Sequence, residues 1–267
     1  MKKMLRKVLR AVADVDPDYF DMYADPQEAC FARLYLERIR CHAAAAGIAP
    51  PASIVEAGCQ AGRLVVPLAR EGYAVTGIDT SGFALRRARA HAKRAGVQAA
   101  FVRGDLGAVL ARDPSRRYDM AVCAEVLYLT PRYRELLAML AGAVRPGGLV
   151  FVSHRSRDYY LLEALRADDP AAAAGVLGRG EGAFRDSKYY NWQTEAQLRS
   201  LYASVGLTWN ALYPIDRIAW LTGLTPGALD AAGRERWLQA ELELSESPAM
   251  CTRYVLVVAS RPARQTA

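Results

Sequence analysis

The stretch that decides the fold is SIVEAGCQAGR, residues 53–63. It begins with a short β-branched run, reaches an acid at Glu56, and breaks into a turn of small residues before the apolar segment 64–69. This order predicts a strand, a tight loop and a helix. Gly58 allows the backbone to turn sharply and approach a ligand closely, and Gly62 allows the helix to start near the strand. The loop is therefore expected at the carboxyl end of a strand, where open α/β sheets bind ligands.

The same alternation of strand and helix continues along the chain. Further strands are predicted at 74–79, 99–103, 118–124, 149–153 and 207–212, and a last one at 252–259; helices are predicted at about 62–71, 82–95, 106–111, 130–144 and 194–205. Connections that contain a helix join parallel strands. The sequence thus predicts an α/β protein whose mostly parallel sheet is covered by helices on both faces.

The domain organisation follows from the places where this alternation stops. Residues 1–50 are expected to form a helical segment that packs on the core, residues 51–260 a single domain, and residues 261–267 a tail. Excursions at about 155–193 and 213–250 interrupt the domain and are too long to be turns. The first of them follows strand five, so it is expected beside the carboxyl edge of the sheet as a cap over a site. The alternative is an insertion that does not touch the substrate.

Composition excludes several classes of protein. The 267 residues are 52% hydrophobic and 24% charged, which is typical of a globular domain. No apolar run approaches the roughly 18 residues that a membrane span requires. The five cysteines lie far apart without a C-x-x-C pair, and three histidines add no zinc spacing, so no metal site is predicted. Reduced thiols predict a cytoplasmic location.

The chain is basic, with a formal net charge of +7. This charge permits an acidic partner such as nucleic acid but does not favour one, because no dense basic and aromatic tract is present. Residues 1–13 hold five basic residues and no acid, with their apolar residues on one helical stripe. That segment is compatible with peripheral contact to an anionic membrane or a partner, or simply with packing on its own domain.

The glycine pattern of the loop excludes two common ligands. A dinucleotide-binding G-x-G-x-x-G that starts at Gly58 requires glycine at positions 60 and 63, which are Gln60 and Arg63. No Gly-Lys-Ser/Thr follows the turn, so a P-loop is excluded as well.

Four acids instead follow the ends of the first four strands: Glu56, Asp79, Asp105 and Glu125. At the carboxyl edge of a parallel sheet they are expected to line one crevice. Asp79 is placed to accept hydrogen bonds from a ribose diol, and Asp105 to reach an adenine amino group. A nucleoside that carries a positive charge suits this acidic crevice better than a pyrophosphate does.

Four segments in order resemble the motifs of the class I S-adenosylmethionine-dependent methyltransferases. They are EAGCQAGR at 56–63, YAVTGIDTS at 73–81, GDL at 104–106 and RPGG at 145–148. The resemblance extends over about residues 52–155, with weaker support from YNWQT at 190–194 and from the final strand. It implies a Rossmann-like, seven-stranded sheet whose last strand runs antiparallel between strands five and six. It also implies S-adenosylmethionine as the methyl donor.

The resemblance further implies which residues bind the cofactor. The loop 56–62 would pass under the methionine part, Asp79 would hold the ribose with Thr80 beside it, and Asp105 would meet the adenine. The full set is Tyr23, Glu56, Ala57, Gly58, Cys59, Gly62, Asp79, Thr80, Asp105, Leu106 and Glu125. One position departs from the family, which usually has glycine where Gln60 stands. Its side chain is expected either to point away from the cofactor or to crowd it.

The leading interpretation is a methyltransferase that acts on a small-molecule acceptor. The alternatives are a tRNA or other RNA methyltransferase, favoured only by the basic charge, and a non-catalytic S-adenosylmethionine-binding module. A base is needed only if the nucleophile loses a proton, and His154 and Tyr128 are the catalytic candidates. The alternative interpretation of His154, which the sequence favours, is a polar residue that ends a strand. The motifs identify neither the acceptor nor the oligomeric state.

The aromatic residues that flank the first excursion have two possible structural roles. They are Tyr159, Tyr160, Tyr189, Tyr190 and Trp192. They would form either a wall for a planar acceptor or the small core of a lid.

Overall fold

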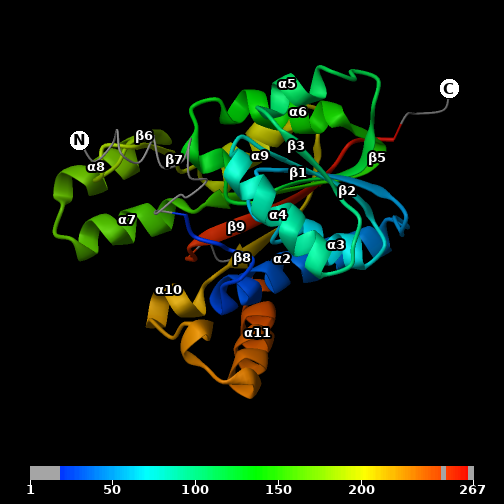
Figure 1. The fold of residues 1–267 in the computed structure, drawn as a ribbon. Helices are drawn as coiled ribbons and strands as arrows, with labels where there is room; N and C mark the ends of the chain where they lie inside the picture. The colour runs from blue at the N-terminus through cyan, green and yellow to red at the C-terminus, as the bar shows by residue number, and fades with distance from the viewer. Residues whose placement is uncertain (1–18, 248–250, 264–267) are drawn as a thin grey trace, which may run out of the picture.

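The computed structural model describes residues 19–247 and 251–263. A seven-stranded sheet crosses the molecule, in the order β3-β2-β1-β4-β5-β9-β8 (Figure 1). Its strands are β1 (Ser53–Ala57), β2 (Ala74–Asp79), β3 (Ala100–Arg103), β4 (Tyr118–Cys123), β5 (Val144–Arg155), β8 (Thr208–Ile215) and β9 (Tyr254–Ser260). Strands β1 to β5 pair in parallel, whereas β9 runs antiparallel to both β5 and β8. The predicted fold, with an antiparallel last strand between strands five and six, is confirmed.

Helices cover both faces of this sheet (Figure 1). The main ones around the sheet are α2 (Pro26–Ala45), α3 (Val65–Arg70), α4 (Gly82–Arg94), α5 (Leu106–Leu110), α6 (Tyr133–Ala143), α9 (Glu195–Ser204) and α11 (Ala231–Ser245). Helix α9, which the sequence predicts at 194–205, starts with a capping box in which Thr194 and Gln197 bond each other's backbone.

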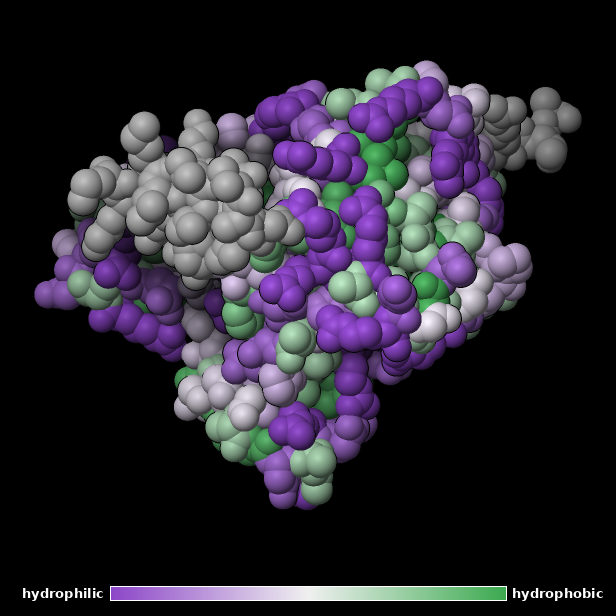
Figure 2. Space-filling view, in the orientation of Figure 1, coloured by the Kyte–Doolittle hydropathy of each residue, from purple (hydrophilic) through white to green (hydrophobic). Residues whose placement is uncertain are grey.

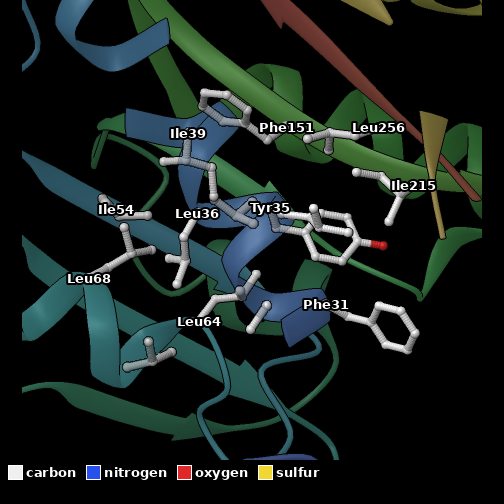
Figure 3. Packing of buried hydrophobic residues seen from close by; sticks show 14 of the residues in the cluster. Phe31, Tyr35, Leu36, Ile39, Ile54, Leu64, Leu68, Phe151, Ile215 and Leu256 are labelled. Atoms are coloured by element: carbon white, nitrogen blue, oxygen red, sulfur yellow. The ribbon is translucent and has the colours of Figure 1, made fainter. Parts of the chain in front are cut away.

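Alternate residues of each strand supply two separate cores. Along β1, Ile54 belongs to the core under α2 and α3, and Val55 to the core under α6 and α9. Phe151 and Val150 of β5 divide in the same way. Successive side chains of a strand point to opposite faces, so these near-continuous apolar strands are buried on both sides. Figure 3 shows the first core, where Tyr35 and Ile39 of α2 lie with strand residues.

Outward faces of the helices are polar. In α4, Ala84, Leu85 and Ala88 are buried. Arg86 and Arg87 of the same helix are exposed. Figure 2 shows mainly hydrophilic side chains on this side of the molecule, with scattered apolar residues. Such one-sided burial is what the spacing of apolar residues along the helix requires.

The first excursion forms a small layer of its own beside the sheet (Figure 1). It contains α7 (Arg157–Arg166), α8 (Pro170–Gly178) and a hairpin of β6 (Glu181–Ala183) and β7 (Tyr189–Asn191). Tyr160, Val176 and Trp192 form its separate apolar cluster. Two of the flanking aromatic residues therefore serve as the core of this layer. The second excursion contains the helical segments α10 (Ile218–Thr222), η2 (Pro226–Ala228) and α11.

Strand β5 differs most from its predicted bounds, since it begins at Val144 and not at residue 149. The segment 146–148 contains Pro and two Gly, which predict a break. In the structure this segment pairs instead with the chain that follows β9: the Gly147 N–H donates to the Arg261 carbonyl at 2.8 Å, and the Arg261 N–H to Gly148 at 2.9 Å.

Two further findings concern the sequence predictions. The segment 1–13, predicted to be basic and amphipathic, lies outside the residues that the structure describes. Within the described part of the chain, no helix is both long and apolar enough to cross a membrane.

The second core provides a stability test. Leu137 of α6 is fully buried, whereas Leu177 of α8 is 60% exposed. We expect Leu137→Ala to lower the free energy of unfolding by about 2–5 kcal/mol, because it removes buried methyl groups and leaves a cavity. Leu177→Ala, the matched control, is expected to cost less than about 1 kcal/mol. Urea denaturation followed by circular dichroism measures both, and equal losses would contradict the assigned core.

Candidate functional site

A cavity of about 430 Å³ lies at the carboxyl ends of β1, β2, β3 and β4. Nine of the eleven predicted cofactor-binding residues line it: Glu56, Ala57, Gly58, Cys59, Asp79, Thr80, Asp105, Leu106 and Glu125. The four acids come from four different strand ends, so the parallel topology alone brings them together. Tyr128, one of the two catalytic candidates, also lines this cavity.

Two predicted binding residues lie outside the cavity lining. Tyr23 stacks on His91, with ring centroids 4.3 Å apart, while its neighbour Met22 lines the cavity. Gly62 lies where α3 approaches α4, and a Cβ there would be 3.4 Å from the Cβ of Ala88. Gly62 thus permits close packing behind the loop, as the sequence indicates for the start of the helix.

The loop after β1 is held by its own backbone and by Asp79. Gly58 has a φ of 78°, and a Cβ at this position would collide with Val126. Gln60 has a φ of 43°, a backbone conformation that is unfavourable for residues with a side chain. This conformation explains why the methyltransferases that the sequence resembles usually have glycine at this position. Its N–H donates to Asp79 Oδ2 at 2.9 Å, and its side-chain amide donates to the Phe20 carbonyl at 2.9 Å. The side chain of Gln60 is therefore tied to the segment before α2.

The acids at the ends of β2 and β3 accept hydrogen bonds from nearby backbone N–H groups and still have lone pairs that a ligand can use. Asp79 accepts from Gln60 through Oδ2 and from the Ser81 N–H through Oδ1, at 2.8 Å. Asp105 is the N-cap of α5 and accepts from the Gly107 N–H at 3.0 Å. A carboxylate has about four acceptor sites, so each acid retains lone pairs for a ligand.

A buried arginine joins three segments around the cavity. Arg63 follows the loop after β1 and contacts Glu28 of α2 through Nη1. Its Nη2 lies 2.7 Å from Glu125 Oε1, and its side chain is only 7% exposed. The guanidinium also lies over the Tyr35 ring, 5.7 Å from the ring centroid. Sequence reasoning used Arg63 only to exclude a dinucleotide loop and missed this role, because Glu28 and Glu125 are distant in sequence.

Glu56 is the most unusual acid of the site. It is 3% exposed, and its Oε2 has no hydrogen-bond partner among the described residues. Burial raises its pKa from 4.5 to about 8, against the opposing effects of Arg63 and of the Val65 N–H. A cation that enters the cavity would favour the ionised form of this carboxyl.

The two catalytic candidates occupy different environments. His154 is 1% exposed, does not line the cavity, and contacts the Tyr202 hydroxyl of α9 through Nε2 at 2.9 Å. Burial lowers its pKa to about 3. The candidate base His154 thus lies outside the cavity, because its side chain points to the α9 face of the sheet, as the structural alternative for this residue predicts. Burial raises the pKa of Tyr128 well above 10, so its hydroxyl stays protonated near neutral pH.

Comparison with known proteins shows similarity to methyltransferases. The sequence pattern of a family described as a methyltransferase domain matches residues 54–148. The ubiquinone biosynthesis O-methyltransferase of Klebsiella pneumoniae is 35% identical over 105 residues, which are 39% of this chain and 43% of that protein. The enzyme of the same name from Erwinia tasmaniensis is 31% identical over 165 residues, 60% of this chain and 66% of that protein. The chain therefore spans less than two thirds of these relatives.

Solved methyltransferase structures have a similar fold. Magnesium protoporphyrin IX methyltransferase from Synechocystis PCC 6803, solved with bound SAH, matches with a TM-score of 0.59. The match covers 98% of this chain and 100% of that one at 17% identity. At this identity the likeness establishes the fold.

The buried carboxyl of Glu56 predicts a pH-dependent stability. Because its folded-state pKa of about 8 lies above 4.5, the folded protein retains a proton between these values that the unfolded chain has lost. The contribution of Glu56 to stability therefore falls as pH rises, by roughly 3–5 kcal/mol across this window. A glutamine side chain does not titrate, so the variant Glu56→Gln lacks this pH dependence. We expect its free energy of unfolding, relative to that of the natural protein, to rise by this amount between pH 4.5 and pH 8.

Urea unfolding at several pH values measures the difference, and the exposed Glu243→Gln is the control. If the difference in the free energy of unfolding between Glu56→Gln and the natural protein stays constant with pH, the raised pKa of Glu56 is contradicted.

Proposed function

Because this chain belongs to the class I S-adenosylmethionine-dependent methyltransferases, we propose that it transfers a methyl group from S-adenosylmethionine to a small-molecule acceptor. The observation that carries the proposal is the single cavity into which Glu56, Asp79 and Asp105 are brought by three successive strand ends. The domain responsible would be residues 51–260, with the N-terminal segment packed on it through α2.

The residues present fit the cofactor. Gly58 has no side chain, so its backbone can come close to the methionine part, and a Cβ there would collide with Val126. Asp79 has lone pairs for the ribose hydroxyls, with Thr80 beside it, and Asp105 and Leu106 would border the adenine. Glu56, whose Oε2 lacks a partner, would face positive charge of the cofactor. Met22, which lines the cavity, would cover the cofactor in place of Tyr23.

The cofactor supplies an electrophilic methyl group on a sulfonium. This chain contributes position and a dry environment, which are the main requirements of an in-line displacement. Val126, Leu127 and Tyr128 form an apolar wall next to Glu125 and would exclude water from the acceptor. With Tyr128 protonated and His154 outside the cavity, we propose that Tyr128 orients the acceptor and does not remove its proton.

The proposed setting is the cytoplasm. All five cysteines are free, and three of them are buried: Cys30, Cys59 and Cys123. Free buried thiols fit a reducing compartment.

Isothermal titration tests the function. S-adenosylmethionine and S-adenosylhomocysteine are expected to bind at tens of micromolar or tighter, and NADH is expected not to bind. Binding of NADH with no binding of the two adenosyl compounds would overturn the proposal. Turnover is then assayed by the release of S-adenosylhomocysteine with candidate small molecules.

The proposed ribose contact has its own test. We expect Asp79→Asn to weaken S-adenosylhomocysteine binding about 10- to 100-fold, because hydrogen bonds to a charged group are worth about 1.5–3 kcal/mol. Titration of the exposed Asp113→Asn, which lies outside this cavity, provides the control and is expected to give the affinity of the natural protein. An unchanged affinity in Asp79→Asn would remove this residue from the ribose site.

A further inference from the structure

Arg155, the last residue of β5, is enclosed by tyrosine side chains. Its guanidinium carbon lies 4.5 Å from the ring centroid of Tyr128, 4.7 Å from that of Tyr159 and 4.8 Å from that of Tyr254. The Tyr160 ring lies 6.0 Å away. Through Nη2 the arginine donates to the hydroxyls of Tyr128, at 3.2 Å, and Tyr254, at 2.5 Å.

No acid balances this charge. Among residues 19–247 and 251–263, no carboxylate lies within ion-pair distance of Arg155, and its buried Nε has no acceptor. Burial raises the pKa of Tyr128 and Tyr254, so both hydroxyls stay neutral at physiological pH. The neighbouring Arg253, by contrast, has its own partner in Asp216 at 3.2 Å. Enclosing a cation without a counter-ion is costly, so an anion bound at Arg155 would relieve that cost.

Arg155 lies between two cavities. It lines a small one of about 200 Å³ together with Tyr159, Tyr160 and Tyr190. On its other side, Tyr128 lines the proposed cofactor cavity and bonds Arg155 through its hydroxyl. Only the Tyr128 side chain would thus lie between a molecule bound at Arg155 and the place where the methyl group is proposed to be transferred.

The acids of the small cavity do not compete for Arg155. Glu163 lies 3.0 Å from Arg166, and Asp186 lies 3.3 Å from Lys188. Asp186 also accepts from the Tyr190 hydroxyl at 2.9 Å. Arg185, another lining residue, has its side chain 3.5 Å from the main-chain oxygen of Glu163 and adds a second positive charge. Each of the two acids that line this cavity therefore has a cationic partner of its own.

We propose that the small cavity at Arg155 binds the anionic group, a carboxylate or phosphate, of the methyl acceptor. The tyrosine rings pack against the planar or apolar body of that acceptor, and Arg155 Nη1 donates to its anionic oxygens. This inference rests on the proposed function and narrows it to acceptors that carry a negative charge at one end. Arg155 acts as a specificity-determining residue and takes no part in the displacement itself.

The experiment compares matched probes on the full chain saturated with S-adenosylhomocysteine. Benzoate, phenyl phosphate and the neutral benzamide are titrated by calorimetry. We expect at least one of the two anions to bind 10-fold or more tightly than benzamide, and the tighter anion identifies carboxylate or phosphate as the preferred group. Equal affinity for anions and amide, or no binding of either anion, would overturn the inference.

Variants assign the preference to Arg155. Arg155→Gln is expected to remove the preference for anions, and Arg155→Lys to retain part of it because the charge remains. Arg199→Gln, on the surface of α9, is the control and is expected to retain the full preference. A preference that persists in Arg155→Gln would overturn the assignment. If circular dichroism shows that Arg155→Gln does not fold, the affinity for anions relative to benzamide, measured in the natural protein and in Arg155→Lys, still tests the inference.

The outcomes for the two proposals are separable. Binding of S-adenosylhomocysteine without any preference for anions overturns only the acceptor inference. If S-adenosylhomocysteine does not bind, the proposed function fails, and the same probes titrated into the protein alone still decide whether Arg155 holds an anion.

Discussion

The buried ion pairs of Arg63 fix the geometry on which the cavity depends. Arg63 joins Glu28 of α2 to Glu125 after β4, and it lies at the end of the loop that follows β1. Removing one partner from such a group leaves a buried charge uncompensated, at a cost of about 3–5 kcal/mol. The arrangement therefore holds only if α2 and both strand ends are in place together. Helix α2 is thus a part of the site's framework, although it lies outside the residues that match the methyltransferase family pattern.

The residues that the sequence could place are those whose role is set locally. Gly58 is required by the turn after β1. Asp79 and Asp105 each accept from the backbone N–H two residues further on, and Asp79 also accepts from the Gln60 N–H of the loop after the neighbouring strand. Because parallel strands end at one edge, knowing the strands was enough to predict that these acids meet. The fold followed from the same local alternation. Bounds were missed where pairing is not local, as at β5, whose start depends on the segment after β9.

The roles that the sequence could not place depend on contacts between distant segments or on the facing of one side chain. Glu28 meets Arg63 across 35 residues, which no motif records. His154 and Arg155 are adjacent on β5 and point to opposite faces of the sheet. The sequence located the end of this strand, but only the tertiary packing shows that His154 faces α9 while Arg155 faces the tyrosines. A shift of one residue thus separates a buried structural histidine from the arginine that is proposed to bind the acceptor.

Within the described part of the chain, the site has incompletely paired acidic groups at one end and an arginine without an ion pair at the other, so its two ends favour ligand groups of opposite charge. Acids without a full set of partners gather near the loop after β1, where Glu56 has an unpaired oxygen. An arginine without an acid stands beyond Tyr128. If the two groups were close enough to pair, each would satisfy the other and neither would attract a ligand. Arg63 pairs with Glu125 instead. A cationic donor at one end and an anionic acceptor at the other would each neutralise the nearer group.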